Sequence, residues 1–290
     1  MAACASTRLG RCERNVYAHK RESQADNAIF SEQSGDKEPG TEDRIHTGSS
    51  TVYRYSSGVE LMAAFASLAN VPIVSGRLTI PSQGLWHADL ALATDSPAVP
   101  ISPSQTLILG TITATCTVVR LTPWTGEVKA RVVGGAGGWT TTLPGKQYSM
   151  PGGSIPTSMV VGDAARAVGE ATPLLDDPAG VASLGPNYFR AYGPAGALLW
   201  ALTDTGVFPH GWWMDLSGVV HTETIPVSTI SSDFSISEVD GACGRYVVFT
   251  EFAADWLPGA SFSCATGRGT VSRVEHRLEN DRMSTEVLSA

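Results

Sequence analysis

The sequence contains little charge and few cysteines. Lysine, arginine, aspartate and glutamate make up only 17% of its 290 residues, and the formal net charge is -8. Because affinity for nucleic-acid phosphates depends on clustered lysine and arginine, this balance argues against a general nucleic-acid-binding protein. The five cysteines form no CxxC pair. We therefore expect free thiols and neither a disulfide framework nor a zinc site.

Long apolar runs and catalytic motifs are also missing. The longest apolar run, around residues 195–202, falls short of the roughly 18 residues that a membrane-spanning helix requires. Residues 1–10 lack the continuous apolar segment of a secretory signal. No GxSxG, HExxH, Walker or dinucleotide-binding motif occurs. The sequence therefore predicts no membrane contact, no cofactor, no metal ion and no catalytic residue.

Glycine and proline are abundant instead, with 30 and 17 residues, and threonine, valine and serine dominate the apolar–polar alternations. This composition favours a β-rich fold, and the length of the chain favours two modest domains. Residues 1–50 differ from the remainder, because they carry charges of both signs and few large apolar side chains. We expect this polar segment to be an extended or disordered arm.

One β-motif occurs twice in degenerate form, at residues 105–133 and at residues 259–288. Each copy contains a strand, a glycine-containing break, a strand with a Thr-Val-x-Arg core, a polar turn and a further strand. The repeat predicts a β-rich α+β fold with two related small β-barrel domains and short connecting helices. The predicted domains after the arm are a first barrel over residues 51–150, a helical and hairpin connecting region over residues 151–226, and a second barrel over residues 227–290.

Apolar residues at helical spacing predict three short helices, at residues 58–70, 157–170 and 195–203. Asn70 suits the C-terminal cap of the first helix, and Thr157 or Ser158 suits the N-cap of the second. The third follows Pro194, a residue that suits the first turn of a helix.

Period-two alternation and turn residues predict two hairpins. One covers residues 71–92 and turns at Ser82, Gln83 and Gly84, and the other covers residues 211–223. The first sheet continues through residues 107–119 and 127–133, around a turn formed by residues 123–126.

Residues 133–139, VGGAGGW, form a glycine-rich segment at the end of the first barrel. Glycine permits positive φ angles and close approach of the backbone. A phosphate-binding loop would need a GxxxxGK lysine between a strand and a helix, whereas this segment continues as WTTTLPGKQY. A structural role is therefore the prediction.

Two pairs of titratable residues are candidate catalytic groups. His87 and Asp89 lie on one face of a predicted strand, but no nucleophile can be assigned beside them, and a structural or surface role is favoured. Glu275 and His276 are adjacent in a strand and point to opposite faces, so they form no dyad.

Polar and aromatic residues gather near the second hairpin. A loose set of nitrogen and oxygen ligands matches no compact metal motif, and loop residues in contact with solvent are the favoured interpretation; the set is His210, His221, Asp204, Asp215 and Glu223. Trp212 and Trp213 are adjacent, so one of them should enter a core while the other is exposed.

The order of these motifs resembles that of bacteriophage tail baseplate hub proteins. The resemblance covers about residues 71–288. The segments that carry it are VSGRLTIPSQGLWHADLAL, TCTVVRLTPWTGEVKARVVGGAGGWTTTLPGKQY, SMVVGDAARAVGE, GWWMDLSGVVHTE and LPGASFSCATGRGTVSRVEHRLENDRMSTEVL. The chain departs from the family in its compact length, its polar leader and the lack of a recognisable lysozyme or peptidase insertion.

The resemblance implies a structural, non-enzymatic protein of the virion that is assembled in the host cytoplasm. In such hubs each subunit contributes two similar barrels, and three subunits form a pseudo-sixfold ring between the hexameric tail tube and the trimeric central spike. The implied partners are two further copies of the chain, the tail tube protein, the central spike protein and other baseplate proteins. The tape-measure protein or DNA would pass through the lumen.

Three residues are predicted to lie at interfaces: Arg120 and Arg273, which match in the two repeats, and Trp124 in the first polar turn. Solvent-exposed strand positions are the alternative interpretation of these residues. Two alternative functions are a cell-wall hydrolase that uses His87 and Asp89, and a carbohydrate- or receptor-binding module that uses Trp212 or Trp213.

Overall fold

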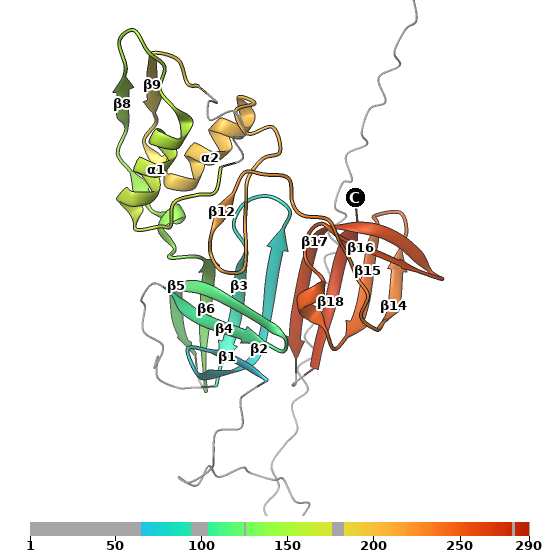
Figure 1. Ribbon diagram of the computed structural model, residues 1–290. Helices are drawn as coiled ribbons and strands as arrows, with labels where there is room; N and C mark the ends of the chain where they lie inside the picture. Colours follow the sequence, from blue (N-terminus) through green and yellow to red (C-terminus); the bar gives the residue numbers. More distant parts are fainter. Residues whose placement is uncertain (1–64, 94–103, 125, 176–182, 280–281, 290) are drawn as a thin grey trace, which may run out of the picture. The chain divides into compact units, whose positions relative to one another are not determined.

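Figure 1 shows a computed structural model of the chain, which describes residues 65–93, 104–124, 126–175, 183–279 and 282–289. The predicted arm over residues 1–50 lies outside the described residues. Eighteen strands and two α-helices make up the described part, which confirms the predicted β-rich α+β fold. In that part no helix is long and apolar enough to span a membrane.

Six strands close into the first barrel. Their order is β1–β4–β5–β6–β3–β2, and β1 also pairs with β2, which completes the circle of antiparallel pairings. Apolar side chains alternate toward the interior, where Leu78, Leu92 and Val132 are fully buried. The strands are β1 (Ala66–Leu68), β2 (Val71–Pro81), β3 (His87–Leu92), β4 (Gln105–Leu109), β5 (Ile112–Trp124) and β6 (Glu127–Gly134).

The second barrel repeats this strand order. Its six strands run β13–β16–β17–β18–β15–β14. Numbered one to six within each barrel, the strands of both barrels follow the order 1–4–5–6–3–2. It differs in two ways: β13 and β16 are parallel, and no pairing between β13 and β14 is present in the described residues. The second barrel is therefore open. Its strands are β13 (Ser228–Thr229), β14 (Phe234–Asp240), β15 (Arg245–Thr250), β16 (Ala260–Cys264), β17 (Gly267–Glu279) and β18 (Arg282–Ser289).

The two barrels also share their β-bulges. In the pairing of fifth with sixth strands, one extra residue is accommodated at Val119 in β5 and at Ser272 in β17. These are the variable positions of the two Thr-Val-x-Arg cores. In the pairing of second with third strands, the extra residue is Val74 in β2 and Ser237 in β14. Because bulges are specific features that bend and twist a strand, their repetition supports the internal duplication that the sequence indicated.

A seam between β2 and β17 joins the barrels into one 12-stranded sheet. The two strands are antiparallel, with Arg273 opposite Pro81 and Glu279 opposite Ser75. Leu78 and Val274 are fully buried on the inner side of this seam. The cores of the two barrels are thus continuous across the sheet.

The connecting region carries the helices and the second predicted hairpin. The helix predicted at residues 157–170 is α1 (Thr157–Val168), and that predicted at residues 195–203 is α2 (Ala195–Asp204). The hairpin of residues 211–223 pairs β11 (Trp213–Met214) with β12 (Val220–His221). The remaining elements are β7 (Thr142–Leu143), β8 (Lys146–Ser149), β9 (Asn187–Arg190), β10 (Gly193–Pro194) and the 3-10 turns η1 (Gly138–Thr140) and η2 (Ala253–Asp255).

The predicted helix caps and the first hairpin turn need correction. Pro156 and Pro194 occupy the N-cap positions of α1 and α2, and neither helix has a side-chain cap, so Thr157 and Ser158 do not serve as caps. Gly169 ends α1 in the left-handed conformation, with φ 75°. The connection between β2 and β3 runs over residues 82–86, because Trp86 turns into the core instead of extending the strand.

The helix predicted at residues 58–70 is wrong over its described part. Ala66–Leu68 is strand β1, and Leu68 pairs with Val71 across the two-residue turn of Ala69 and Asn70. Both turn residues have positive φ, 49° and 67°, as type I′ hairpin turns require. The left-handed conformation expected of Asn70 is present, but it closes a hairpin. Pairing of β1 with both β2 and β4 overrides the helical spacing of these small apolar residues.

Replacing Ala69 by glycine is expected to raise the free energy of unfolding by about 1 kcal/mol, because glycine adopts positive φ without the steric cost that alanine bears. Chemical denaturation of the full chain measures the change. Ala93→Gly is the matched control: Ala93 does not have positive φ, so the added backbone entropy of the unfolded chain should lower stability there. Equal effects at both positions would contradict the turn assignment.

Candidate functional site

One face of the sheet carries a row of charged side chains that crosses both barrels. Residues opposite one another in antiparallel strands lie on the same face. The register places Arg120 opposite Arg131, Arg131 opposite Asp89, Asp89 opposite Arg77, and Arg77 opposite Arg277. Five strands, β5, β6, β3, β2 and β17, thus contribute to one continuous line, which we call the charged row.

The charged row continues over the second barrel as a network of ion pairs. Arg277 Nη2 lies 3.1 Å from Glu286 Oε2, and Arg245 Nε lies 2.8 Å from Glu286 Oε1. Arg245 Nη1 also lies 2.8 Å from Glu238 Oε1 on β14. Hydrogen bonding from Arg245 holds the pKa of Glu286 below its usual value. Glu286 therefore remains ionised at neutral pH, and the ion pairs tie β17, β18, β15 and β14 together.

Glu275 is the centre of the charged row at the seam. Its side chain is only 10% exposed, and three arginines surround it. The nearest nitrogens are Nε of Arg277 at 2.6 Å, Nε of Arg77 at 3.2 Å and Nη2 of Arg273 at 3.7 Å. Arg77 comes from the first barrel and the other two from the second. The carboxylate thus links the two barrels, although the partly exposed arginines limit the energy of each pair.

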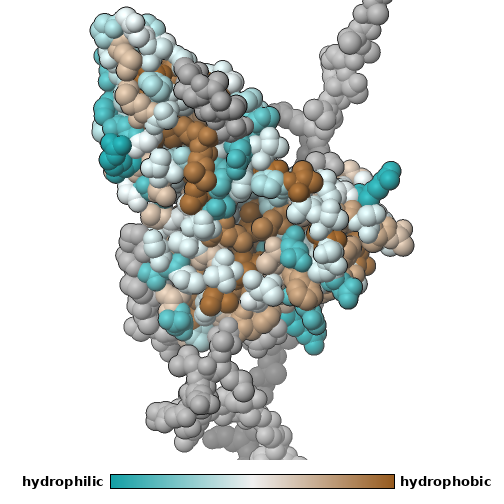
Figure 2. Space-filling model, in the orientation of Figure 1, coloured by the Kyte–Doolittle hydropathy of each residue, from teal (hydrophilic) through white to brown (hydrophobic). Residues whose placement is uncertain are grey.

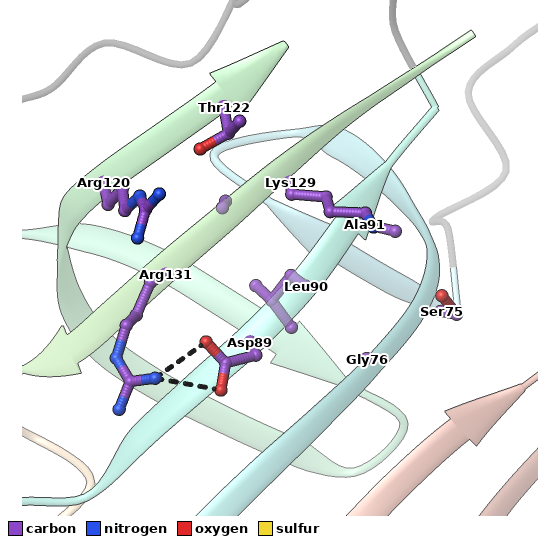
Figure 3. A pocket seen from close by; sticks show the side chains of 10 residues that line it. Ser75, Gly76, Asp89, Leu90, Ala91, Arg120, Thr122, Lys129 and Arg131 are labelled. Atoms are coloured by element: carbon purple, nitrogen blue, oxygen red, sulfur yellow. Dashed lines mark hydrogen bonds and ion pairs between the residues drawn. The ribbon is translucent and has the colours of Figure 1, made fainter. Parts of the chain in front are cut away.

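A concavity of about 460 Å³ lies at the first-barrel end of the charged row. Figure 3 shows Arg120, Lys129, Arg131 and Asp89 around it, with the Arg131 guanidinium beside the Asp89 carboxylate. Arg131 Nη1 donates to both carboxylate oxygens, at 3.1 and 3.2 Å. Three cations accompany a single carboxylate here, so the concavity is locally positive. Arg120 forms no ion pair with any described residue.

The predicted interface residues lie in different environments. Arg120 is exposed on the charged row, whereas Arg273, its counterpart in the repeat, binds Glu275 within the chain. Trp124 is the last residue of β5, opposite Glu127, and is not part of the turn. Both arginines are exposed, and among the described residues only the one at the internal seam, Arg273, pairs with a carboxylate.

The glycine-rich segment holds an anion from the chain itself. Gly135 and Gly137 have positive φ, and the N–H groups of Ala136, Gly138 and Trp139 donate to the Glu170 carboxylate at 3.2, 2.6 and 3.4 Å. Burial raises the pKa of Glu170, against the opposing effect of these hydrogen bonds. A phosphate-binding role is thus not supported, because the amides that would bind phosphate already bind Glu170 beyond the end of α1.

The alternative catalytic pair is not assembled. No hydrogen bond joins His87 to Asp89 in the part of the chain that the structure describes, and Asp89 is bound by Arg131. Burial lowers the pKa of the half-buried His87. These contacts give His87 and Asp89 structural positions on the sheet and provide no support for a hydrolase.

Part of the loose ligand set near the second hairpin does come together. His221 Nε2 lies 3.0 Å from Asp215 Oδ2, and Nδ1 lies 3.3 Å from Glu223 Oε1. His210 and Asp204 take no part in this group. Over the described ranges no cluster of three or more histidine, cysteine, aspartate or glutamate side chains could hold a metal ion. The group instead stabilises the hairpin.

Of the two adjacent tryptophans, one is buried and the other is partly exposed, as predicted. Trp212 is buried, while Trp213 is partly exposed and stacks on the His221 ring with centroids 4.3 Å apart. Trp213 Nε1 donates to the Glu223 carbonyl at 3.0 Å. One face of Trp213 is therefore already covered by the hairpin.

An apolar hollow of about 320 Å³ lies beside this hairpin. Residues from β2, from the hairpin and from the segment before β16 line it, among them Ile80, Met214, Leu216, Ile225 and Leu257. Figure 2 shows apolar residues gathered near the middle of the same view as Figure 1. The hairpin thus packs against residues of both barrels.

No family model and no curated protein matches the chain. Several solved structures do match the chain. The c3393 protein of E. coli, described as a component of the type VI secretion system with structural similarity to the T4 bacteriophage tail proteins gp27 and gp5, has a TM-score of 0.50 at 8% identity, covering 79% of this chain and 76% of that one. The 43 kDa tail protein of prophage MuSo2 from Shewanella oneidensis has a TM-score of 0.49 at 9% identity, covering 75% and 93%. A tail protein from Neisseria meningitidis MC58 has a TM-score of 0.43 at 10% identity, covering 77% and 94%. The match to the E. coli protein shows a shared fold, as the sequence resemblance implied.

Proposed function

We propose that this chain is a structural component of a phage tail baseplate, a hub whose three copies form a pseudo-sixfold ring between the tail tube and the central spike. The observation that carries the proposal is the duplicated barrel, with one strand order and one set of bulges in both halves. A closed trimer of such chains presents six similar units to a sixfold partner while keeping threefold symmetry for another.

The continuous sheet and the likeness to the E. coli protein support this proposal. A sheet that continues through both barrels is a suitable wall for a ring. The description of the E. coli protein relates it to phage tail proteins, and its fold is the one found here. On this basis the partners are two further copies of the chain, the tail tube protein, the central spike protein and other baseplate proteins. The tape-measure protein or DNA would pass through the lumen of a virion component assembled in the host cytoplasm.

The purified full chain is expected to have three times its single-chain mass by light scattering, because a ring with three copies closes all equivalent contacts. Negative-stain images of the same sample should show rings with six similar lobes. Mixing with the tail tube protein should produce a stoichiometry of three chains to six tube subunits. A mass of one chain over the whole accessible concentration range, with and without the tube protein, would contradict the trimer.

A further inference from the structure

We infer that the concavity on the first barrel binds carboxylates from an acidic segment of a partner protein. Its lining includes the cations of Arg120, Lys129 and Arg131. The inference comes from a comparison of the two barrels. It goes beyond the proposed hub and does not depend on how many copies form a ring.

The bulges fix which positions of the two barrels are equivalent. Two residues after Arg120, which follows the bulge of β5, Thr122 lies opposite Lys129. In β17, Glu275 lies two residues after the arginine that follows the bulge, and it lies opposite Glu286. Glu275 of the second barrel thus corresponds to Thr122 of the first. Glu286 likewise corresponds to Lys129.

The equivalence extends across the third and second strands. Lys129 lies opposite Ala91, and Ala91 lies opposite Ser75, the residue after the bulge of β2. In the second barrel the same two steps lead from Glu286 to Glu238, the residue after the bulge of β14. One row of the second barrel therefore carries three carboxylates, whereas the matching row of the first carries none. Figure 3 shows the residues of this first-barrel row around the concavity.

In the second barrel the three carboxylates lie beside arginines of the same chain. Glu275 Oε2 lies 3.7 Å from Arg273 Nη2. Glu286 and Glu238 both bind Arg245, each at 2.8 Å. The second barrel thus balances the charge of its arginines with its own side chains.

The first barrel lacks this balance. Arg120 is exposed and forms no ion pair with any described residue. Among the described residues of the lining, Asp89 supplies the only carboxylate, and Arg131 binds it. The positions of two of the missing glutamates hold the smaller side chains of Ser75 and Thr122, so space is left as well as positive charge. The volume of about 460 Å³ lies in the range typical of binding pockets.

Carboxylates suit this surface better than nucleic-acid phosphates do. A guanidinium binds a planar carboxylate through two parallel hydrogen bonds, and the second barrel has carboxylates at the equivalent positions. Three cations neutralise few phosphates, and the net charge of -8 opposes the approach of a DNA backbone. The occupant is therefore a protein segment rich in aspartate and glutamate.

A fluorescein-labelled hexaglutamate peptide is the probe for the full chain. Fluorescence anisotropy in about 0.1 M salt, where distant charges are screened, should show saturable binding. Arg120→Gln should weaken it about tenfold, because it removes a cation that the chain itself leaves unpaired. Thr122→Glu should weaken it by about the same factor without removing a cation. The new carboxylate would lie beside Arg120 as Glu275 lies beside Arg273.

Two matched controls separate the concavity from the overall charge of the chain. Thr113→Glu adds the same charge to an exposed threonine of β5 outside the concavity, and Arg166→Gln removes an exposed arginine of α1. Both should bind the peptide within about twofold of the wild type, because salt screens charges away from the site. Far-ultraviolet circular dichroism checks folding. Equal weakening by Thr113→Glu and Thr122→Glu would contradict a local site.

Chemical modification locates the contact. The peptide should slow the reaction of phenylglyoxal with Arg120 and Arg131 and leave that of Arg166 unchanged, as measured by mass spectrometry after digestion. Equal rates with and without peptide would overturn the inference. A labelled DNA duplex whose binding Arg120→Gln weakens would assign the surface to nucleic acid instead.

The outcomes for this surface and for the hub are distinguishable. A trimer that does not bind the peptide overturns the acidic-segment site and leaves the ring proposal standing. A monomer that binds the peptide, with the expected losses in Arg120→Gln and Thr122→Glu, contradicts the ring and supports the site.

Discussion

Replacing Gly138 by alanine is expected to lower the free energy of unfolding by about 3 kcal/mol, an effect typical of overpacking in a close contact. A Cβ at this position would lie 2.3 Å from the Val168 carbonyl oxygen and 2.9 Å from Glu170 Cγ. The first of these atoms is backbone in the last turn of α1, so relief requires the turn or the helix end to move. The same shift would break the hydrogen bonds to Glu170.

Gly162→Ala is the control for this substitution. Gly162 lies inside α1, and nothing lies within 4 Å of an added Cβ. Alanine there should stabilise the protein by about 0.5–1 kcal/mol, because glycine is a poor helix former. Urea denaturation of both variants gives the difference. If Gly138→Ala is as stable as the wild type, the packing of the glycine-rich segment on α1 is not as described.

Lowering the pH from 6.5 to about 4 is expected to destabilise the fold by about 3 kcal/mol through His276 alone. His276 is 1% exposed, and its Nδ1 lies 2.9 Å from Thr285 Oγ1. Burial lowers its pKa from 6.5 to about 4. Between these values the unfolded chain binds a proton that the folded chain does not, so stability falls as the pH falls. Below about 4 the loss from this residue is complete.

The variant His276→Asn should lose this dependence on pH while keeping a polar contact to Thr285. His87 acts in the same direction through its lowered pKa, and it is only half-buried. The carboxylates of Glu286, Asp163 and Asp215 also have lowered pKa values, and their contribution is lost at lower pH, as they are protonated. Denaturation midpoints measured at intervals from pH 7 to pH 3 separate the pH range in which His276 is protonated from the lower range in which the carboxylates are protonated. An unchanged profile in His276→Asn would contradict the assignment.

The duplication was accessible from the sequence because it resides in local pattern. The Thr-Val-x-Arg cores mark the two fifth strands, and the variable residue in each is the bulge. The helices at residues 157–170 and 195–203 were predicted for the same reason, since their apolar spacing is regular. The helix predicted over residues 66–68 is wrong because small apolar residues fit a helix or a buried strand equally well. Pairing with β2 and β4 decides for the strand.

The charged row could not be predicted, because it is a product of register between distant strands. Arg77 meets Glu275 only when the two barrels join, and nothing near either residue indicates the other. Glu170 and the glycine-rich segment illustrate the same limit. The sequence predicts a structural role for this segment, but the carboxylate that its amides bind belongs to Glu170, 32 residues after Gly138. Arg120 and Arg273 were singled out together, and only the structure separates their environments.

The seam between β2 and β17 has a consequence for curvature. The seam sets the rotation and translation that relate the first barrel to the second. If the same rotation and translation related neighbouring copies, the twist of the seam would decide whether the barrels close into a ring or continue as an open helical filament. A substitution that alters the strand twist at this seam would then convert the ring into a helical polymer, even if the stability of the fold were unchanged.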